Sequence, residues 1–470
     1  MRYLNTGKAN VVRPLSAIHN KEELRYDLYA DSAHPHSYPG PNRPHNQDFP
    51  MKFDILTLSL LAVLAGFPAM AQPPQGAPAG RGTQPPVEID KSAPTEDFKP
   101  SSLNQPGKQY PEVNSQRRVR TQLRAPNAQT VLIDMGGVRY PMTKDENGAW
   151  TGVTNAQDEG FHYYQLNVDG VSIPDPGSQI FYGSSRWGGA VEIPAHDQDI
   201  YALKNVPHGQ LREVHYFSKV ANATLQSFVY TPPDYEKGTK RYPVLYLQHG
   251  AGEDEHGWGG QGFAGRIMDN LLAEGKAKPF LIVISNSYLV TGGAGRGPGR
   301  GAAPGAGRGP APAGAPGAPG RAGGGRGPMA MTDTPFEHAL IEDIIPFIDA
   351  NFRTQADQAH RGLAGLSMGG MLTHGITLAH LDKFSHIGMF SGGSIATSEI
   401  KDMADFKKKV KLLFISYGSR EPGSSAGQAA VEALKKEGVN SVSYESPQTA
   451  HEWQSWRRSL HEFAQLAFQK

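Results

Sequence analysis

The chain has no cysteine among its 470 residues, which excludes disulfide bonds but neither supports nor opposes export from the cell. The H-E-x-x-H pattern of zinc hydrolases is missing, because His451-Glu452 and His461-Glu462 each lack a second histidine at that spacing. The phosphate-binding pattern G-x-x-x-x-G-K-[ST] is missing despite 55 glycines. Charge of one sign is not in excess, since 46 Lys and Arg balance 45 Asp and Glu. We therefore expect no metal, no cofactor and no nucleic-acid partner.

Apolar runs long enough to span a membrane are also lacking, and the run from Ile55 to Phe67 is too short for a convincing span. It follows Met51-Lys52 and ends in Ala69-Met70-Ala71, which is the pattern of a signal peptide over residues 51–71. A signal peptide is read at the amino terminus, so we expect translation to begin at Met51 and residues 1–50 to be a non-native upstream extension. We expect a secreted or periplasmic protein without stable membrane insertion; a single anchor helix is the alternative.

A stretch of β character follows a Pro/Gly-rich linker at residues 72–94. Short strands are expected at 131–134, 149–153 and 161–168, separated by turn-forming residues. This spacing predicts a small β-sandwich over residues 95–205. Its aromatic residues either bind glycan or fill the core and the domain interface, and the second interpretation is favoured; they are Trp150, Tyr163 and Trp187.

Every residue from 292 to 328 is Gly, Ala, Pro or Arg. Such a composition cannot bury enough apolar surface to order itself, so we expect a disordered insertion. Its arginines resemble those of RNA-binding tracts, but aromatic residues are missing from it. It follows an expected strand at 280–285, at the sheet edge where loops contact ligands.

The string Gly365-Leu366-Ser367-Met368-Gly369 carries the most chemical information. It has the form G-x-S-x-G, follows the apolar run 361–366 and precedes helix-forming residues from 368 to 380. That context is typical of a nucleophile elbow, in which a tight strand-to-helix turn exposes the serine oxygen. Ser367 is therefore predicted to be a nucleophile, and a plain glycine turn is the alternative.

A serine nucleophile needs a base and an acid that orients it, in the chain order Ser, Asp or Glu, His. His451 lies in a loop after the expected last strand, at 442–446, and is the predicted base. Glu421 lies in the loop after the expected strand 411–417 and is the predicted acid. A surface carboxylate paired with Arg420 is the alternative for Glu421, and two aspartates in a charged, helix-like stretch compete for its role: Asp402 and Asp405.

Ester hydrolysis also needs donors for the oxyanion of the tetrahedral intermediate. The backbone N–H of Met368, directly after the nucleophile, is one expected donor. The H-G-x-G turn after the strand at 242–248 should supply the other, from Gly250 or Ala251. His249 is expected to hold the shape of that turn.

Four segments together resemble a known family: YPVLYLQHGAGEDEHGW, FEHALIEDIIPFID, RGLAGLSMGG and ESPQTAHEWQSWRRSL. From about residue 216 to the carboxyl terminus the chain is similar to the esterase D branch of α/β-hydrolases, and more closely to the feruloyl and acetyl-xylan esterases of carbohydrate esterase family one. The resemblance implies an α/β-hydrolase domain over residues 206–470, with Ser367 as nucleophile, His451 as base and an acid on the loop of Glu421. Many members have aspartate where this chain has Glu421. Two tryptophans are expected to bind substrate: Trp258 and Trp453.

The region before that domain resembles the immunoglobulin-like early-set modules found in front of esterases of this group, in RTQLRAPNAQTV, DENGAWTG and GFHYYQLNVDGV. We therefore expect a serine esterase that removes feruloyl or acetyl groups from plant cell-wall xylan. A short-chain acyl esterase or lipase-like hydrolase, a peptidase of the same fold, and a carbohydrate-binding protein with an inactive hydrolase domain are the alternatives. The sequence does not indicate an oligomeric state.

Overall fold

The computed structural model describes residues 88–289 and 331–469, which belong to one compact unit, Thr83–Lys470. The expected upstream extension 1–50, the expected signal peptide 51–71, most of the linker 72–94 and the expected disordered insertion 292–328 lie outside the described residues. In the described part of the chain, no helix is both long and apolar enough to cross a membrane.

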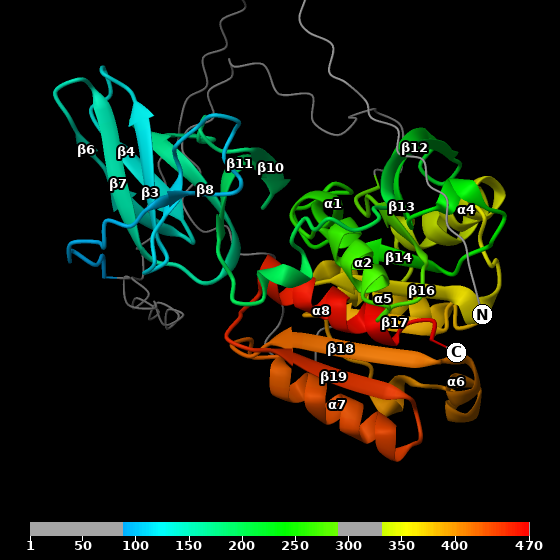
Figure 1. Cartoon of the computed structure of the whole chain (residues 1–470). Helices are drawn as coiled ribbons and strands as arrows, with labels where there is room; N and C mark the ends of the chain where they lie inside the picture. The colour runs from blue at the N-terminus through cyan, green and yellow to red at the C-terminus, as the bar shows by residue number, and fades with distance from the viewer. Residues whose placement is uncertain (1–87, 290–330, 470) are drawn as a thin grey trace, which may run out of the picture. The chain divides into compact units, whose positions relative to one another are not determined.

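Two antiparallel sheets form the first part of the described chain, and we call them the N-terminal sheets (Figure 1). The first has the strand order β1-β2-β3-β7-β6, and the second has the order β10-β11-β8-β4-β5 with β9 paired to β8. The strands are β1 (Lys99–Pro100), β2 (Glu112–Val113), β3 (Arg118–Arg124), β4 (Val131–Met135), β5 (Val138–Pro141), β6 (Thr143–Lys144), β7 (Ala149–Ala156), β8 (Gly160–Val168), β9 (Val171–Ile173), β10 (Ile180–Gly183) and β11 (Arg186–Ile193). The three strands predicted from the sequence are therefore present, as β4, β7 and β8.

A shared apolar core joins the two N-terminal sheets. Val119 of β3 and Trp150 of β7 lie in one cluster with Ile133 of β4 and Leu166 of β8. Alternating buried residues along β4 and β7 produce this core, because successive side chains of a strand point to opposite faces.

The three aromatic residues considered as glycan ligands differ in their burial. Trp150 is buried, and its indole N–H donates to the Ala125 carbonyl oxygen. Tyr163 is mostly buried against residues of the second part of the chain, and only Trp187 of the three is exposed, at 55%. The interpretation as core and interface residues is confirmed for Trp150 and Tyr163.

An eight-stranded sheet with the order β12-β13-β15-β14-β16-β17-β18-β19 forms the second part. Its strands are β12 (Gln210–Ser218), β13 (Ala223–Thr231), β14 (Val244–Gln248), β15 (Leu281–Ser285), β16 (Arg361–Leu366), β17 (His386–Phe390), β18 (Leu412–Gly418) and β19 (Ser441–Ser446). From β15 to β19 all neighbours are parallel, whereas β12 and β13 are antiparallel. The parallel strands β14 to β18 are buried along their whole length, which explains their nearly continuous apolar sequences.

Helices cover both faces of this sheet (Figure 1). On one face, α2 (Ala264–Ala273) and α8 (Trp453–Leu466) pack on the sheet through Ile267 and Leu460. On the other face lie α5 (Met368–Ala379), α6 (Met403–Lys409), α7 (Ser424–Lys436) and the segment from α3 (Pro335–Ala339) to α4 (Ile345–Asn351). The remaining short helices are α1 (Gly257–Gly260), η1 (Gln198–Ile200), η2 (Tyr235–Lys237), η4 (Gln358–His360) and η5 (Thr397–Glu399).

The helical segment from residue 335 to residue 351 is interrupted. It comprises α3 (Pro335–Ala339), the π-helical turn η3 (Leu340–Ile344) and α4 (Ile345–Asn351). Pro346 lies in the first turn of α4 and has no N–H to donate to the preceding turn. A widened helical turn before Pro346 is the local adjustment to that missing hydrogen bond.

The strand order brings several loops to one edge of the sheet. The chain passes from β14 to its neighbour β15 and then crosses to β16 on the other side of β14. Loops that leave the carboxyl ends of β14 and β16 therefore meet at a topological switch point, where parallel α/β sheets hold their ligands. The H-G-x-G turn follows β14, and Ser367 follows β16 directly.

Candidate active site

Ser367 occupies a strained turn between β16 and α5. Its φ of 51° and ψ of −116° are unusual for a residue with a side chain. The flanking glycines make the turn possible: a Cβ on Gly365 would lie 2.5 Å from the Gly369 backbone, and one on Gly369 would lie 2.7 Å from the His249 carbonyl oxygen. The local geometry is that of the nucleophile elbow expected from the sequence.

The structure brings the three predicted site residues together in one hydrogen-bonded chain. His451 Nε2 lies 2.8 Å from Ser367 Oγ, and His451 Nδ1 lies 2.8 Å from Glu421 Oε2. These residues follow the carboxyl ends of β16, β19 and β18, so three separate loops converge on one point. The arrangement can move a proton from the serine to the imidazole while the carboxylate orients the ring.

Glu421 is held as a carboxylate by its hydrogen bonds. Burial by itself would raise its pKa, but donors from His451, Ser391 and the Gly418 backbone outweigh burial and hold the pKa of Glu421 below its usual value. Ser391 Oγ donates to Glu421 Oε1 at 2.6 Å, and the Gly418 N–H donates to the same oxygen at 2.8 Å. Its alternative partner, Arg420, instead forms an ion pair with Asp158 at 2.8 Å.

Two further residues support this chain and were missed by the sequence analysis. Trp456 donates from its indole N–H to Ser391 Oγ at 3.1 Å. Its ring also packs edge-on against His451, with centroids 5.1 Å apart and an 89° angle. Trp456 lies in the quoted segment ESPQTAHEWQSWRRSL, within the pattern H-x-W-x-x-W-R that runs from His451 to Arg457, and that pattern was a usable signal. Ser391 could be found only from its position after β17.

The two competing aspartates, and other histidines that follow Ser367 in the sequence, lie elsewhere. Asp402 caps α6 by accepting from the Asp405 N–H, and Asp405 pairs with Lys409 on the same helix. His374 is buried on α5, and His386 is buried at the start of β17. His461 lies on α8, beside Glu462 at 2.9 Å.

The H-G-x-G turn lies against the nucleophile. A Cβ placed on Gly250 would come within 3.4 Å of the Ser367 Cβ. The Gly250 N–H already donates to Glu253 Oε2 at 3.2 Å. Of the two residues expected to supply the second oxyanion donor, Gly250 and Ala251, Ala251 is therefore the better candidate. Ala251 is an exposed residue.

Trp258 and Trp453 do not lie where a substrate could stack on them. Trp258 is 0% exposed and Trp453 is 2% exposed, and their rings pack edge-on with centroids 5.4 Å apart. The indole of Trp258 donates to the Gln248 carbonyl oxygen, and that of Trp453 contacts the Tyr163 hydroxyl oxygen at 3.3 Å. The prediction that they bind substrate is therefore wrong in this structure, because both belong to the core behind the site.

A cavity of about 480 Å³ opens beside Ser367 and His451. Its walls combine small residues after β17 with the loop after β18, and they are Met371, Ser391, Gly392, Gly393, Ser394, Tyr417, Arg420, Glu421, Pro422, Gly423, Ala426 and Ala450. This volume is in the range of small-molecule sites.

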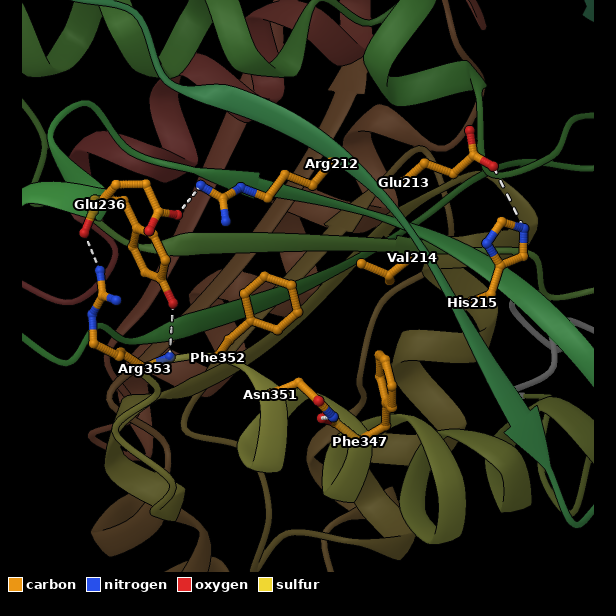
Figure 2. Close-up of a pocket in the computed structure, with 10 residues that line it drawn as sticks. Arg212, Glu213, Val214, His215, Glu236, Phe347, Asn351, Phe352 and Arg353 are labelled. Atoms are coloured by element: carbon orange, nitrogen blue, oxygen red, sulfur yellow. Dashed lines mark hydrogen bonds and ion pairs between the residues drawn. The ribbon is translucent and has the colours of Figure 1, made fainter.

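A second cavity, of about 540 Å³, lies against β12 and α4 and contains no serine. Figure 2 shows that its charged groups face one another: Arg212 contacts Glu236, and Glu213 lies 3.5 Å from His215. Arg353 packs over the Tyr235 ring with its guanidinium 3.8 Å from the centroid. Because these charges are already paired, this cavity is not a comparable candidate for catalysis.

Two groups of acidic residues and histidine in the described part of the chain could offer three ligand atoms to a cation: Glu159, His196 and Asp197, and Asp254, Glu255 and His256. Neither group contains Ser367, His451 or Glu421. Asp197 is in addition paired with Arg458 at 2.6 Å.

Comparison with known proteins agrees with this geometry. The family described as "Putative esterase" matches residues 218–290 and 326–466. An endo-1,4-beta-xylanase/feruloyl esterase of Xylanibacter ruminicola is 41% identical over 393 residues, which are 81% of this chain and 49% of that protein. Endo-1,4-beta-xylanase Y of Acetivibrio thermocellus is 23% identical over 235 residues, 46% of this chain and 18% of that protein. The chain thus spans half or less of the length of these relatives.

Among solved structures, the enterobactin esterase of Shigella flexneri matches with a TM-score of 0.51 at 15% identity, covering 74% of this chain and 92% of that one. At this identity the similarity concerns the fold, and it agrees with the α/β-hydrolase architecture predicted for the second part of the chain. Together, the matched family and the relative that is 41% identical show that the part of the chain from residue 218 to residue 466 belongs to the esterase family.

Proposed function

We propose that this chain is a serine esterase that removes feruloyl or acetyl groups from plant cell-wall xylan. The observation that carries the proposal is the continuous chain Ser367–His451–Glu421, with both contacts at 2.8 Å. The match to a protein named as a xylanase/feruloyl esterase supports the choice of substrate.

In the proposed mechanism Ser367 Oγ attacks the ester carbonyl carbon while His451 Nε2 takes its proton. Glu421 stabilises the resulting imidazolium through Nδ1. The carbonyl oxygen becomes an oxyanion that accepts hydrogen bonds from the Met368 and Ala251 backbone N–H groups. His451 then returns the proton to the leaving sugar oxygen, which leaves the acyl group on Ser367.

A water molecule then hydrolyses the acyl-enzyme by the same steps in reverse. His451 removes a proton from the water as it attacks the acyl carbon, and the second oxyanion uses the same two donors. Collapse releases the carboxylic acid and returns the proton to Ser367. The cavity lined by Tyr417, Pro422 and Ala426 is the proposed acyl pocket, because it opens directly at Ser367.

The test is an assay of the purified full chain on feruloylated and acetylated xylo-oligosaccharides, with p-nitrophenyl acetate as a general ester. We expect turnover of at least one oligosaccharide ester, and the ratio between the two identifies the acyl group. Ser367→Ala should fold normally and lower turnover by about three orders of magnitude or more, because the covalent step is removed.

A Ser367→Ala variant with nearly wild-type turnover would overturn the assignment of the nucleophile. Turnover of p-nitrophenyl acetate alone would reduce the proposal to a short-chain acyl esterase. Binding of xylan without turnover of any ester would instead indicate a carbohydrate-binding protein.

We further propose that the N-terminal sheets form an early-set module and that the chain is exported through the segment 51–71. Support for the module comes from the quoted sequence likeness and from the two antiparallel sheets with a shared core. Support for export is the sequence pattern of residues 51–71 alone. Mass spectrometry of the protein recovered from the cell envelope or the medium should find Gln72 as its first residue, and a chain retaining residues 51–71 would contradict cleavage there.

A further inference from the structure

Glu253 is a buried carboxyl group that the proposed mechanism does not use. It is 6% exposed, and burial raises its pKa to about 7. Its Oε2 accepts from the Gly250 N–H at 3.2 Å, inside the turn that lies against Ser367. A buried carboxyl group is costly to retain, so the contacts that this one makes are informative.

Three contacts hold the backbone of Gly250: its N–H donates to the Glu253 carboxylate, and its carbonyl oxygen, which shares a peptide group with the Ala251 N–H, makes the other two. The Gly250 carbonyl oxygen accepts from the Glu253 N–H at 3.3 Å and lies 2.8 Å from His249 Nδ1. His249 Nε2 accepts from the Ser287 N–H at 3.0 Å, so in the neutral ring Nδ1 carries the hydrogen and donates to Gly250. Burial lowers the pKa of His249, which favours that neutral ring.

The orientation of the Ala251 N–H follows from these contacts. In a planar trans peptide the C=O and the following N–H point in opposite directions. The Glu253 carboxylate fixes the Gly250 N–H, and His249 Nδ1 and the Glu253 backbone N–H fix the Gly250 carbonyl oxygen, so the Ala251 N–H is aimed away from that oxygen. An oxyanion donor is effective only when its direction is set before the reaction.

The N-terminal sheets contribute to the same turn. The hydroxyl of Tyr163, on β8, lies 3.5 Å from Glu253 Oε1. That hydroxyl is itself held by the Gln261 side-chain amide at 2.7 Å and by the Trp453 indole N–H at 3.3 Å.

A second contact comes from the turn between β10 and β11. The Ser185 N–H donates to the Gly252 carbonyl oxygen at 2.8 Å. Gly252 has a φ of +77°, and a Cβ there would lie 2.9 Å from the Ser185 nitrogen, so glycine is needed for this approach.

We infer that Tyr163 and Glu253 are positioning residues for the oxyanion donor at Ala251, and that the N-terminal sheets are therefore a functional part of the active centre. The inference rests on the proposed function, since it assigns a role in the same reaction. It differs from a purely structural role, because it predicts a loss of turnover that exceeds any loss of folded protein.

The test compares Glu253→Met, Glu253→Gln and Tyr163→Phe in the full chain, with kcat and KM measured on p-nitrophenyl acetate and Tm measured for each variant. Glu253→Met removes the acceptor of the Gly250 N–H at similar volume and should lower kcat on the order of 10²-fold, with little change in KM. Glu253→Gln keeps a carbonyl oxygen at the same length and should restore most of that kcat. Tyr163→Phe should lower kcat by roughly 3- to 10-fold, the value of one hydrogen bond.

Wild-type kcat in Glu253→Met and Tyr163→Phe, beside an inactive Ser367→Ala, would overturn the inference and leave the esterase proposal standing. Equal losses of kcat in Glu253→Met and Glu253→Gln, in proportion to their losses of Tm, would also overturn the inference. If Glu253→Met does not fold, an unchanged kcat in Tyr163→Phe still overturns the inference. An inactive wild-type chain would overturn the proposed function, and the inference with it.

Discussion

At the level of single residues, both carboxylate oxygens of Glu421 have hydrogen-bond partners. Glu421 receives hydrogen bonds from Ser391 and Gly418 on one oxygen and contacts His451 with the other. The ring of Trp456 packs edge-on against the ring of His451, the hydrogen-bond partner of Glu421. The orientation of the imidazole therefore depends on Ser391, Gly418 and Trp456 as well as on Glu421.

Glu421→Gln should lower kcat on p-nitrophenyl acetate by about 10²- to 10⁴-fold, less than the loss of Ser367, because the amide can hold the wrong tautomer of His451. Asp402→Asn is the matched control, since Asp402 only caps α6 and asparagine caps equally well. We expect its kcat to equal that of the wild type. A harmless Glu421→Gln together with a crippling Asp402→Asn would place the acid on the other loop.

The lowered pKa of Glu421 also predicts how stability depends on pH. Because its hydrogen bonds hold the pKa in the folded state below that of the unfolded chain, Glu421 contributes fully to the free energy of unfolding above the unfolded value, about 4.3. That contribution is lost as the pH falls through the folded pKa. The difference in Tm between wild type and Glu421→Gln should therefore be largest near neutral pH and shrink below about pH 4. A constant difference across this range would contradict the lowered pKa.

At the scale of elements, α8 is tied to β11 by a buried ion pair. The guanidinium of Arg457 is 0% exposed and contacts both Glu192 oxygens, at 2.7 and 3.1 Å. Its Nε also donates to the Gln261 carbonyl oxygen at 2.8 Å. Arg457 ends the H-x-W-x-x-W-R motif, and its contacts show that this motif holds α8 in place as well as carrying His451.

Arg457→Met should lower the free energy of unfolding by about 3–5 kcal/mol, because it leaves the Glu192 carboxylate buried without a partner. Adding Glu192→Met should recover much of this loss, since a buried pair can be replaced by apolar groups at little net cost. Lys435→Met is the control: its pair with Glu432 is exposed on α7 and should be worth less than about 1 kcal/mol. Urea unfolding curves measure all three, and equal effects of Arg457→Met and Lys435→Met would contradict the argument.

At the scale of the whole described chain, one apolar cluster includes residues of both parts. Phe161 of β8 and Ala190 of β11 belong to the same buried cluster as Trp453 and Leu460 of α8. Arg458 adds an ion pair to Asp197. The N-terminal sheets are therefore joined to the second part by a core and not only by a linker.

This shared core predicts cooperative unfolding. Differential scanning calorimetry should show a single transition for the N-terminal sheets and the eight-stranded sheet, because exposing one part removes the apolar partners of the other. Arg457→Met should lower the temperature of that transition without splitting it. Two separate transitions in the wild type would show that the two parts are energetically independent.

Features that depend on neighbouring residues can be predicted from the amino-acid sequence alone. The parallel strands β14, β15, β16 and β18 are recognisable because each is a short, mostly apolar run. The G-x-S-x-G turn is recognisable because only glycine fits beside Ser367. The order Ser367, Glu421, His451 along successive loops was likewise sufficient to predict which residues the structure brings together.

Tertiary structure decided the rest, because burial and hydrogen-bond partners depend on segments that are far apart in the chain. Trp453 and Tyr163 are separated by 290 positions, yet their contact turns an expected substrate ligand into a core residue. No local pattern distinguishes a tryptophan that faces a cavity from one that faces a second layer of the fold. The same holds for Glu253: its sequence neighbourhood is that of a polar turn, and only packing against the N-terminal sheets buries its carboxyl group beside the turn that faces Ser367.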